Sequence, residues 1–414
     1  MSEQVVHAAG PAGSRAAPPP YLIFFFGALA ALGPLSIDAY LPGIPAMARA
    51  FGVTVVSLQN TLNVFLVGYA LGQFFGGALS DQIGRKRVGY AGLAVYLVTS
   101  IAIAFAANVE QMLALRFLQA IGGGFSTVIC LATVRDVYPV EQLGRRFATV
   151  TMVLLIAPLV APALGAAVLP LGWEMIFVLK AVYAGVLICT YAVLVPETRP
   201  GKLRNLSLRS VFRQCADVVR RRVDGGRLPI RYAMAMAFSA TVMMIFVTNS
   251  AFIYMEYFGV SPSRFPWLFA ASVLGIMSTT LLSMWRLTSH NAGRFFRAGL
   301  TIQVVCVAGL LVVVLSGYVT LAAFVPLLVL TVLTVGLVGP SGSTRYMGFF
   351  RELAGSASSV YTTTMFLLGG TAGWLSSVLN DGSLVPIVVM MLGASLTANA
   401  ISWGLPRQPP PVEA

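Results

Sequence analysis

Long apolar runs separated by short polar connections make up most of the chain. From residue 21 onward twelve such runs can be marked off, each about as long as the ~20 residues that a helix needs to cross the hydrocarbon core of a bilayer. They cover residues 21–45, 57–79, 88–107, 112–134, 146–170, 173–195, 232–257, 264–285, 294–316, 320–340, 356–379 and 384–405. The pattern predicts an all-α integral membrane protein with twelve transmembrane helices and no sizeable soluble domain.

The longest polar connection, residues 196–231, divides the chain into halves of six segments each, 21–195 and 232–405. The pairs Gly84-Arg85 and Gly293-Arg294 each stand just before the third segment of their half, which is the kind of weak echo that an internal repeat leaves. We therefore predict two pseudo-symmetric six-helix halves.

The connection itself carries a helical pattern. Apolar residues recur at helical spacing between Leu208 and Val219, with arginines interleaved. We predict an amphipathic helix on the cytoplasmic membrane surface, where anionic lipid attracts basic side chains, with a flexible linker as the alternative. The Ala-, Pro- and Gly-rich residues 1–20 are predicted to be a disordered cytoplasmic tail, and residues 406–414 a second cytoplasmic tail.

Composition and charge agree with a membrane protein. Hydrophobic residues make up 57% of the chain and charged residues 10%, and the net charge is +13. The basic residues gather in alternate connections, with only Arg49 and Arg264 on the opposite side, which places both termini in the cytoplasm by the positive-inside rule and argues against a nucleic-acid partner. Two distant histidines, His7 and His290, indicate no metal site, and we expect no cofactor.

Three motifs of the first half resemble signatures of the major facilitator superfamily. Residues 77–87, GALSDQIGRKR, resemble its loop 2–3 signature G-x-L-x-D-x-x-G-R-K; residues 116–124, RFLQAIGGG, resemble its fourth-helix signature; residues 157–167, APLVAPALGAA, resemble the fifth-helix signature of its antiporters. The stretches IDAYLPGIP, VRDVYP and VPETRP are similar to those of Bcr/CflA-type drug-resistance exporters, whereas the tenth-helix region matches only loosely. The resemblance implies a carrier of the bacterial inner membrane that works by alternating access.

The loop signature implies a cytoplasmic gate. Its members are expected to be Gly77, Asp81, Gly84, Arg85, Arg135 and Asp136. Asp81 would latch onto the positive end of the eleventh helix at Gly355-Ser356 when the carrier faces outward, while Arg85 pairs with Asp136. The alternative is that the basic residues of this loop serve only as positive-inside anchors.

One carboxylate lies within the first apolar segment. Asp38 needs a partner, a water-filled cavity or a proton at membrane depth, and Arg116 of the fourth segment is expected at a similar depth. We predict that Asp38 and Arg116 meet in the central cavity and couple transport to protons. A purely structural lock between the first and fourth helices is the alternative.

Prolines and a glycine interrupt the fifth segment. Pro158, Pro162 and Gly165 predict a bent helix that approaches a neighbour closely, as a seal between the halves or simply as a kinked core helix. We further assign Tyr40, Asn63, Gln119 and Asn249 as candidate substrate contacts.

These observations lead to one function and several rivals. We predict a monomeric proton-coupled antiporter that exports small amphipathic molecules or antibiotics, with protons, the substrate and the lipid bilayer as its partners. Export of an endogenous metabolite, such as a siderophore or an amino acid derivative, is the alternative. A membrane enzyme is disfavoured because the chain contains no HExxH, GxSxG or Walker sequence, and a channel because two six-helix halves suit alternating access better.

Overall fold

The computed structural model describes residues 21–195, 208–223, 226–288, 290–350 and 352–405, and within these ranges the fold is helical with a single isolated β-bridge. The predicted tails, 1–20 and 406–414, and most of the linker before Leu208 lie outside the described residues.

The first half contains seven α-helices and two short 3-10 turns. In chain order they are α1 (Leu22–Asp38), η1 (Leu41–Gly43), α2 (Ile44–Phe51), α3 (Val55–Ile83), α4 (Arg85–Ile103), α5 (Val109–Val137), α6 (Val140–Val168), η2 (Leu169–Leu171) and α7 (Glu174–Leu194).

The linker helix and the second half follow. They are α8 (Leu208–Arg220), α9 (Ile230–Ala251), the π-helical turn η3 (Phe252–Tyr257), α10 (Phe265–Arg286), α11 (Ala292–Leu315), α12 (Leu321–Leu333), α13 (Val335–Gly348), α14 (Ala354–Val378) and α15 (Val385–Ser402).

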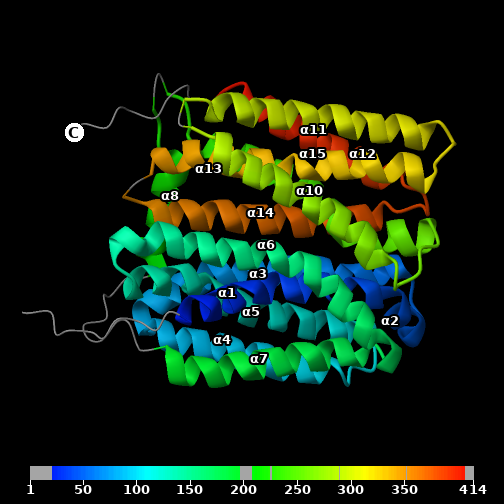
Figure 1. Ribbon diagram of the computed structural model, residues 1–414, viewed down its shortest axis with the longest axis horizontal. Coiled ribbons are helices and arrows are strands. Elements are labelled where there is room, and N and C mark those ends of the chain that lie inside the picture. The colour runs from blue at the N-terminus through cyan, green and yellow to red at the C-terminus, as the bar shows by residue number, and fades with distance from the viewer. Residues whose placement is uncertain (1–20, 196–207, 224–225, 289, 351, 406–414) are drawn as a thin grey trace, which may run out of the picture.

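Each of the twelve apolar segments appears as one long helical run, and ten of these runs are long and apolar enough to span a bilayer. The other two are α4 and α14. The first turn of α4 carries the basic triplet Arg85, Lys86 and Arg87, and α14 carries nine Ser and Thr residues, which lowers the hydropathy of both. Both are nevertheless packed among the spanning helices (Figure 1).

The first run is broken soon after Asp38. Pro42 and Pro45 have no backbone N–H to donate, so α1 gives way to the turn η1 and then to α2, which extends the run to Phe51. The break leaves the last carbonyl groups of α1 without partners inside the helix.

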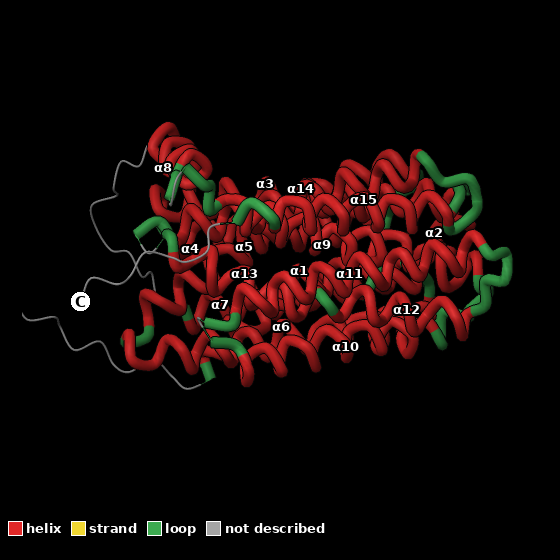
Figure 2. Tube along the Cα trace, turned by 90° about the horizontal axis from the view of Figure 1, so that it is seen from above, coloured by secondary structure: helices red, strands yellow, loops and turns green. Residues whose placement is uncertain are grey.

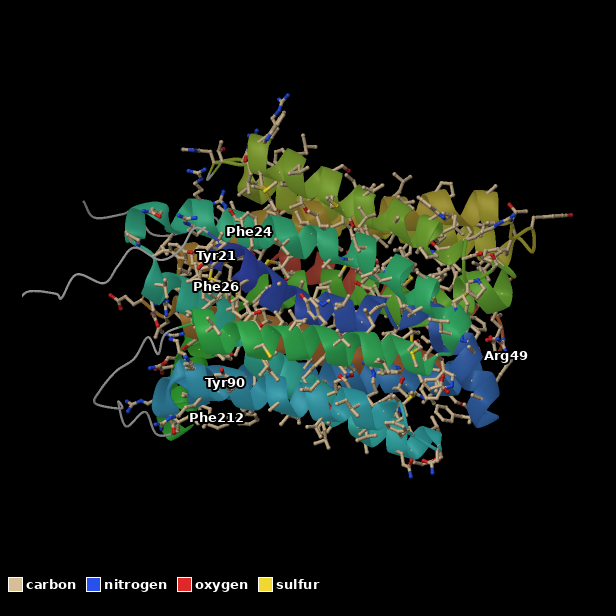
Figure 3. All side chains as sticks on the ribbon, turned by 60° about the horizontal axis from the view of Figure 1, so that its bottom comes forward. Tyr21, Phe24, Phe26, Arg49, Tyr90 and Phe212 are labelled. Atoms are coloured by element: carbon tan, nitrogen blue, oxygen red, sulfur yellow. The ribbon has the colours of Figure 1, made fainter. Side chains whose placement is uncertain are left out.

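The helices run roughly along the long axis of the molecule, with the second half above the first in the view of Figure 1. Contacts between the halves run mainly through α3 against α14 and α6 against α10. The helix α8 lies at one end of the bundle, seen from above in Figure 2. We call the end near α8 and Arg85 the basic end and the opposite one the far end; Phe212 and Tyr90 lie near the former and Arg49 at the latter (Figure 3).

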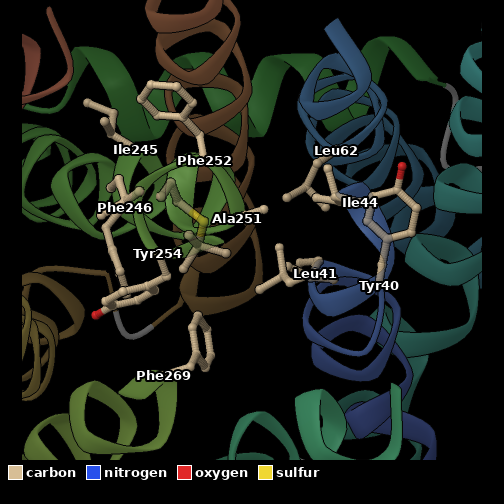
Figure 4. Packing of buried hydrophobic residues seen from close by; sticks show 14 of the residues in the cluster. Tyr40, Leu41, Ile44, Leu62, Ile245, Phe246, Ala251, Phe252, Tyr254 and Phe269 are labelled. Carbon is tan, nitrogen blue, oxygen red and sulfur yellow. The ribbon is translucent and has the colours of Figure 1, made fainter. Parts of the chain in front are cut away.

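The buried apolar residues form different clusters at the two ends. At the far end a single cluster joins both halves, with Tyr40, Leu41 and Leu62 from the first half and Phe246 and Phe252 from the second (Figure 4). At the basic end each half has its own cluster. The halves therefore share one apolar cluster at the far end and have separate apolar clusters at the basic end.

Glycines set the spacing inside the first half. A Cβ atom at Gly72 of α3 would lie 2.5 Å from the carbonyl oxygen of Ile121 in α5, and one at Gly68 would lie 2.7 Å from that of Phe117. Only glycine allows two backbones to come this close, so α3 and α5 form a rigid pair along the first half.

Candidate functional site

A cavity of about 250 Å³ lies between the two halves. The first half contributes α1, α3 and α6 to its wall, and the second half contributes α9, α10, α12 and α14. The residues that define its character are Ile37, Asp38, Tyr69, Pro158, Met243, Met244, Phe246, Phe269, Met277 and Phe366. Aromatic rings and flexible methionines suit an apolar or amphipathic small molecule, since methionine adapts its shape to varied ligands.

Asp38 is the one carboxylate in the described lining of this cavity. It is the last residue of α1, its exposed fraction is 5%, and it is the only Asp or Glu among the fully buried residues that the structure describes. Because an isolated carboxylate anion is costly at membrane depth, the surroundings of Asp38 must supply positive charge or a proton.

Lys180 of α7 brings a buried basic side chain to the end of α1, although no ion pair with Asp38 is found among the described side chains. Its side chain is completely buried, and its Nζ donates a hydrogen bond of 3.0 Å to the carbonyl oxygen of Ser36, two residues before Asp38. That carbonyl is one of the unpartnered groups at the end of α1, so the break in the first helix creates the acceptor that orients the lysine.

Arg116 of α5 does not contact Asp38 directly, contrary to the expectation from the sequence. Its Nη1 and Nη2 atoms donate to the Ser36 carbonyl oxygen at 3.3 and 3.4 Å, and Nη1 also donates to Gln119 Oε1 at 2.8 Å. Among the described side chains no hydrogen bond or ion pair joins Asp38 to Arg116. The guanidinium group thus binds the free Ser36 carbonyl at the end of α1 and not the Asp38 carboxylate.

Aromatic rings surround the two buried cations. The Arg116 guanidinium lies 4.3 Å from the ring centroid of Phe65 and 4.6 Å from that of Tyr40, and Lys180 Nζ lies 5.3 Å from the Tyr40 ring. Cation–π attraction of this kind partly replaces the lost hydration of the cations. Asp38, Lys180 and Arg116 therefore form one buried charged group held by the break in the first helix.

The four candidate substrate contacts are not among the residues that line the cavity. They are Tyr40, Asn63, Gln119 and Asn249. Tyr40 hydrogen-bonds Thr61 through its hydroxyl group at 2.7 Å, and Gln119 joins Arg116 to Ser100. The polar groups of Tyr40 and Gln119 are therefore used in holding the charged group in place.

The two asparagines act where the halves meet at the far end. A Cβ atom at Gly373 of α14 would overlap with the Asn63 side chain, and the Asn249 side chain donates to Ser376 of α14 at 2.8 Å. In this conformation they hold α14 against α3 and α9, and they are not exposed to a ligand in the cavity.

The gate residues lie at the basic end. Arg85 Nε lies 2.6 Å from Asp136 Oδ2, and Gly84 joins α3 to α4 with φ of 102°, a conformation that favours glycine. Arg135 is exposed, and a Cβ atom at Gly77 would make only an ordinary contact with Val128. The side chain of Asp81 lies outside the described residues.

Comparison with known proteins decides the family. Residues 24–374 match the family model described as Major Facilitator Superfamily. The chain belongs to this superfamily.

Relatives of the same superfamily align over nearly the whole chain. A bicyclomycin resistance protein homolog of Haemophilus influenzae is 26% identical over 92% of this chain and 94% of its own. A chloramphenicol resistance protein of Pseudomonas aeruginosa is 29% identical over 89% of this chain and 85% of its own, and the uncharacterized MFS-type transporter YdgK of Bacillus subtilis (strain 168) is 28% identical over 94% and 96%. These names agree with the resemblance to drug-resistance exporters.

Solved structures support the superfamily fold. A D-xylose–proton symporter superposes with a TM-score of 0.73 at 12% identity, covering 93% of this chain and 97% of its own. A bacterial homolog of the human lysosomal transporter Spinster gives 0.66 at 14% identity, covering 92% and 96%. The protein is thus a transporter of the major facilitator fold and not an enzyme.

Within this fold the fifth spanning helix, α6, which contains Pro158 and Pro162, contacts both halves. Pro158 lines the central cavity, but a Cβ atom at Gly165 would overlap with the carbonyl oxygen of Ala39 in the first half itself. Gly165 therefore lets α6 approach the break in the first helix, whereas the contact with the other half runs along α6 against α10.

Two features of the site were missed in the sequence. Lys180 was visible as an intramembrane charge, but nothing in the sequence showed that α7 would bring it to the same Ser36 carbonyl oxygen as Arg116. Tyr69 and Phe366 meet across the halves with ring centroids 5.0 Å apart, and their aromatic character alone did not distinguish them from lipid-facing residues.

Proposed function

We propose that this transporter is a proton-coupled antiporter that exports small amphipathic molecules from the bacterial cytoplasm by alternating access. The observation that carries the proposal is Asp38, a buried carboxylate on the wall of the cavity between the two halves, close to the cation of Lys180. A carboxylate in this position borders the space where the substrate would bind, and its protonation changes the net charge buried in the bundle.

The coupling follows from charge balance. When Asp38 is ionised, it offsets part of the charge of Lys180 and Arg116; when it takes up a proton, that compensation is lost. A substrate that binds next to the carboxylate favours proton release, and a proton that arrives from outside favours substrate release. Because the substrate and the proton compete for the same carboxylate, export of the substrate is coupled to entry of protons.

In alternating access the substrate enters the cavity from the cytoplasm and the proton enters it from outside. With the basic end in the cytoplasm, as the positive-inside rule indicates, the single shared cluster closes the external end, while the two separate clusters belong to an inward-facing state. The Arg85–Asp136 pair, with Gly77, Gly84 and Arg135 around it, would guide the closing of the cytoplasmic end. Asp81 would then latch onto α14 at Gly355-Ser356.

The apolar lining supports an amphipathic substrate. Relatives named for resistance to bicyclomycin and chloramphenicol favour antibiotics, and a secreted metabolite of similar polarity would bind by the same contacts. We therefore place both classes in the test panel. We expect the protein in the bacterial inner membrane as a monomer with both termini in the cytoplasm.

The test is proton movement in inside-out vesicles energised by respiration. Antibiotics and secreted metabolites are added to vesicles that carry the wild type, Asp38→Asn, or Asp217→Asn as a matched control, because Asp217 lies exposed on α8 outside the cavity. We expect substrate-triggered proton release in the wild type and in the control but not in Asp38→Asn.

Two results would contradict the proposal. Full substrate-triggered release by Asp38→Asn would show that coupling does not depend on this carboxylate. No release from wild-type vesicles, although a panel compound binds the purified protein, would contradict antiport itself.

A further inference from the structure

A second cavity, of about 350 Å³, opens at the basic end of the second half and is separate from the central one. It lies between α11 and α15, next to the turn in which Val223 and Arg227 form an isolated β-bridge. Its lining is polar and basic, with Arg227, Arg297, Thr301, Asn399 and Trp403 as the side chains that can bind a ligand. The proposed transport cycle assigns no role to it.

The polar floor of this cavity is organised before any ligand arrives. Asn399 of α15 donates to Thr301 Oγ1 of α11 at 3.3 Å and accepts a hydrogen bond from Trp403 Nε1 at 3.1 Å. Arg227 is fixed by a hydrogen bond of 3.2 Å from its Nη1 atom to the carbonyl oxygen of Leu405. The cavity thus has fixed walls, and hydrogen-bond partners for the other guanidinium donors of Arg227 are not found among the described residues.

The charge of the cavity has no internal counterpart in the described structure. No carboxylate is among its lining residues, and no hydrogen bond or ion pair of the Arg297 guanidinium is found within the described part of the chain. Two arginines with free planar donors are the residues best suited to bind phosphate oxygens.

The surroundings identify the source of the phosphate. Trp403 has an exposed fraction of 84% at the level where α15 ends, which is typical of an indole at the membrane interface. Toward the middle of the bilayer, Ile302 and Val305 of α11 and Leu396 of α15 are exposed apolar side chains. A polar basic cavity directly above a hydrocarbon-facing surface fits a headgroup with acyl chains attached.

We infer that this cavity, defined by Arg227, Arg297, Asn399 and Trp403, binds the phosphate of an anionic phospholipid. The two guanidinium groups contact the phosphate oxygens, the acyl chains lie along α11 and α15, and Trp403 covers the glycerol region. The lipid would join the linker turn to the end of the last helix.

The test is lipid binding to the purified full-length protein in detergent, followed by native mass spectrometry. The probes are dioleoylphosphatidylglycerol, dioleoylphosphatidylcholine and inorganic phosphate. We expect one tightly bound phosphatidylglycerol, with affinity about tenfold or more above that of phosphatidylcholine, because the choline cation of the latter offsets the charge of its phosphate and is repelled by the two guanidinium groups.

A matched pair of variants locates the site. Arg227→Gln with Arg297→Gln should weaken phosphatidylglycerol binding about tenfold, whereas Arg145→Gln with Arg286→Gln, which removes two exposed arginines of the same end outside the cavity, should leave it unchanged. Folding of each variant is checked by size-exclusion chromatography. The competition among probes on the wild type does not depend on the variants.

Three outcomes would overturn the inference. Equal weakening by both double variants would show that binding follows net charge alone. Equal affinity for the two lipids would show that no anionic headgroup is recognised. Displacement of phosphatidylglycerol by inorganic phosphate at similar affinity would assign the cavity to free phosphate.

Discussion

At the scale of single residues, the buried lysine is the least expected part of the site. Lys180 is completely buried and binds the Ser36 carbonyl oxygen, two residues before Asp38. Removing one of two opposite buried charges leaves the other uncompensated, which destabilises a protein. The pair should therefore behave as a unit.

This predicts a specific pattern in a double-mutant cycle. Lys180→Met and Asp38→Asn alone should each lower the melting temperature of the purified transporter, and the double variant should recover part of the loss, with a coupling free energy of about 0.5–3 kcal/mol. Lys86→Met, which removes a lysine of the basic end that donates to the Ala192 carbonyl, is the control and should have little effect. Additive losses would mean that Asp38 and Lys180 do not interact.

How much of the site was predictable depends on the residue. Asp38 was identifiable because a carboxylate within an apolar segment is rare and costly. Its neighbours were not, because their positions depend on the break after α1: the freed Ser36 carbonyl attracts both Arg116 and Lys180. Sequence spacing gives the depth of a residue in the membrane, but not which free backbone carbonyl its side chain will bind.

At the scale of elements, the close approach of α6 to the end of α1 controls the geometry around Asp38. A side chain at Gly165 would overlap with the Ala39 backbone, next to the last residue of α1. We predict that Gly165→Ala lowers stability by about 1–3 kcal/mol, as overpacking does, and reduces transport by displacing the charged group. Thermal unfolding in detergent and uptake into vesicles measure the two effects.

The matched control is Gly185→Ala on α7, because no atom lies within 4 Å of a Cβ built there. It should be nearly neutral in both measurements. If the two variants behaved alike, the close contact between α6 and the first helix would have no energetic importance.

The helical runs were the most predictable elements, and their interruptions were the least. Twelve apolar segments correspond to twelve long helical runs, ten of which are long and apolar enough to span a bilayer by length and hydropathy alone. The π-helical turn at Phe252–Tyr257 contains no proline or glycine from which it could have been predicted. It arises from packing at the far end, where Phe252 and Tyr254 belong to the shared cluster.

At the scale of the whole molecule, the arrangement of the clusters predicts from which side the central cavity is reached. Met243 lines the cavity and is only partly buried, whereas Leu62 is fully buried in the shared cluster at the far end. In a background without the four native cysteines, Met243→Cys should react with a membrane-impermeant thiol reagent in inside-out vesicles. Leu62→Cys should stay unreactive.

The comparison uses vesicles of both orientations. Faster labelling of Met243→Cys in right-side-out vesicles would contradict an inward-facing resting state. A saturating concentration of a transported compound should protect Met243→Cys from the reagent, which independently tests whether this cavity holds the substrate.

The unequal clustering at the two ends also determines where the free energy of switching resides. The clusters of the basic end each belong to one half, so they move as rigid parts and stay intact while the halves rotate. In the proposed cycle the far-end cluster would have to separate and become hydrated each time the transporter opens outward. Substitutions there should therefore change how often it opens to that side. Because Phe246 and Phe269 belong both to this cluster and to the lining of the central cavity, a substitution at either residue would change the closure of the far end and the space next to Asp38 together.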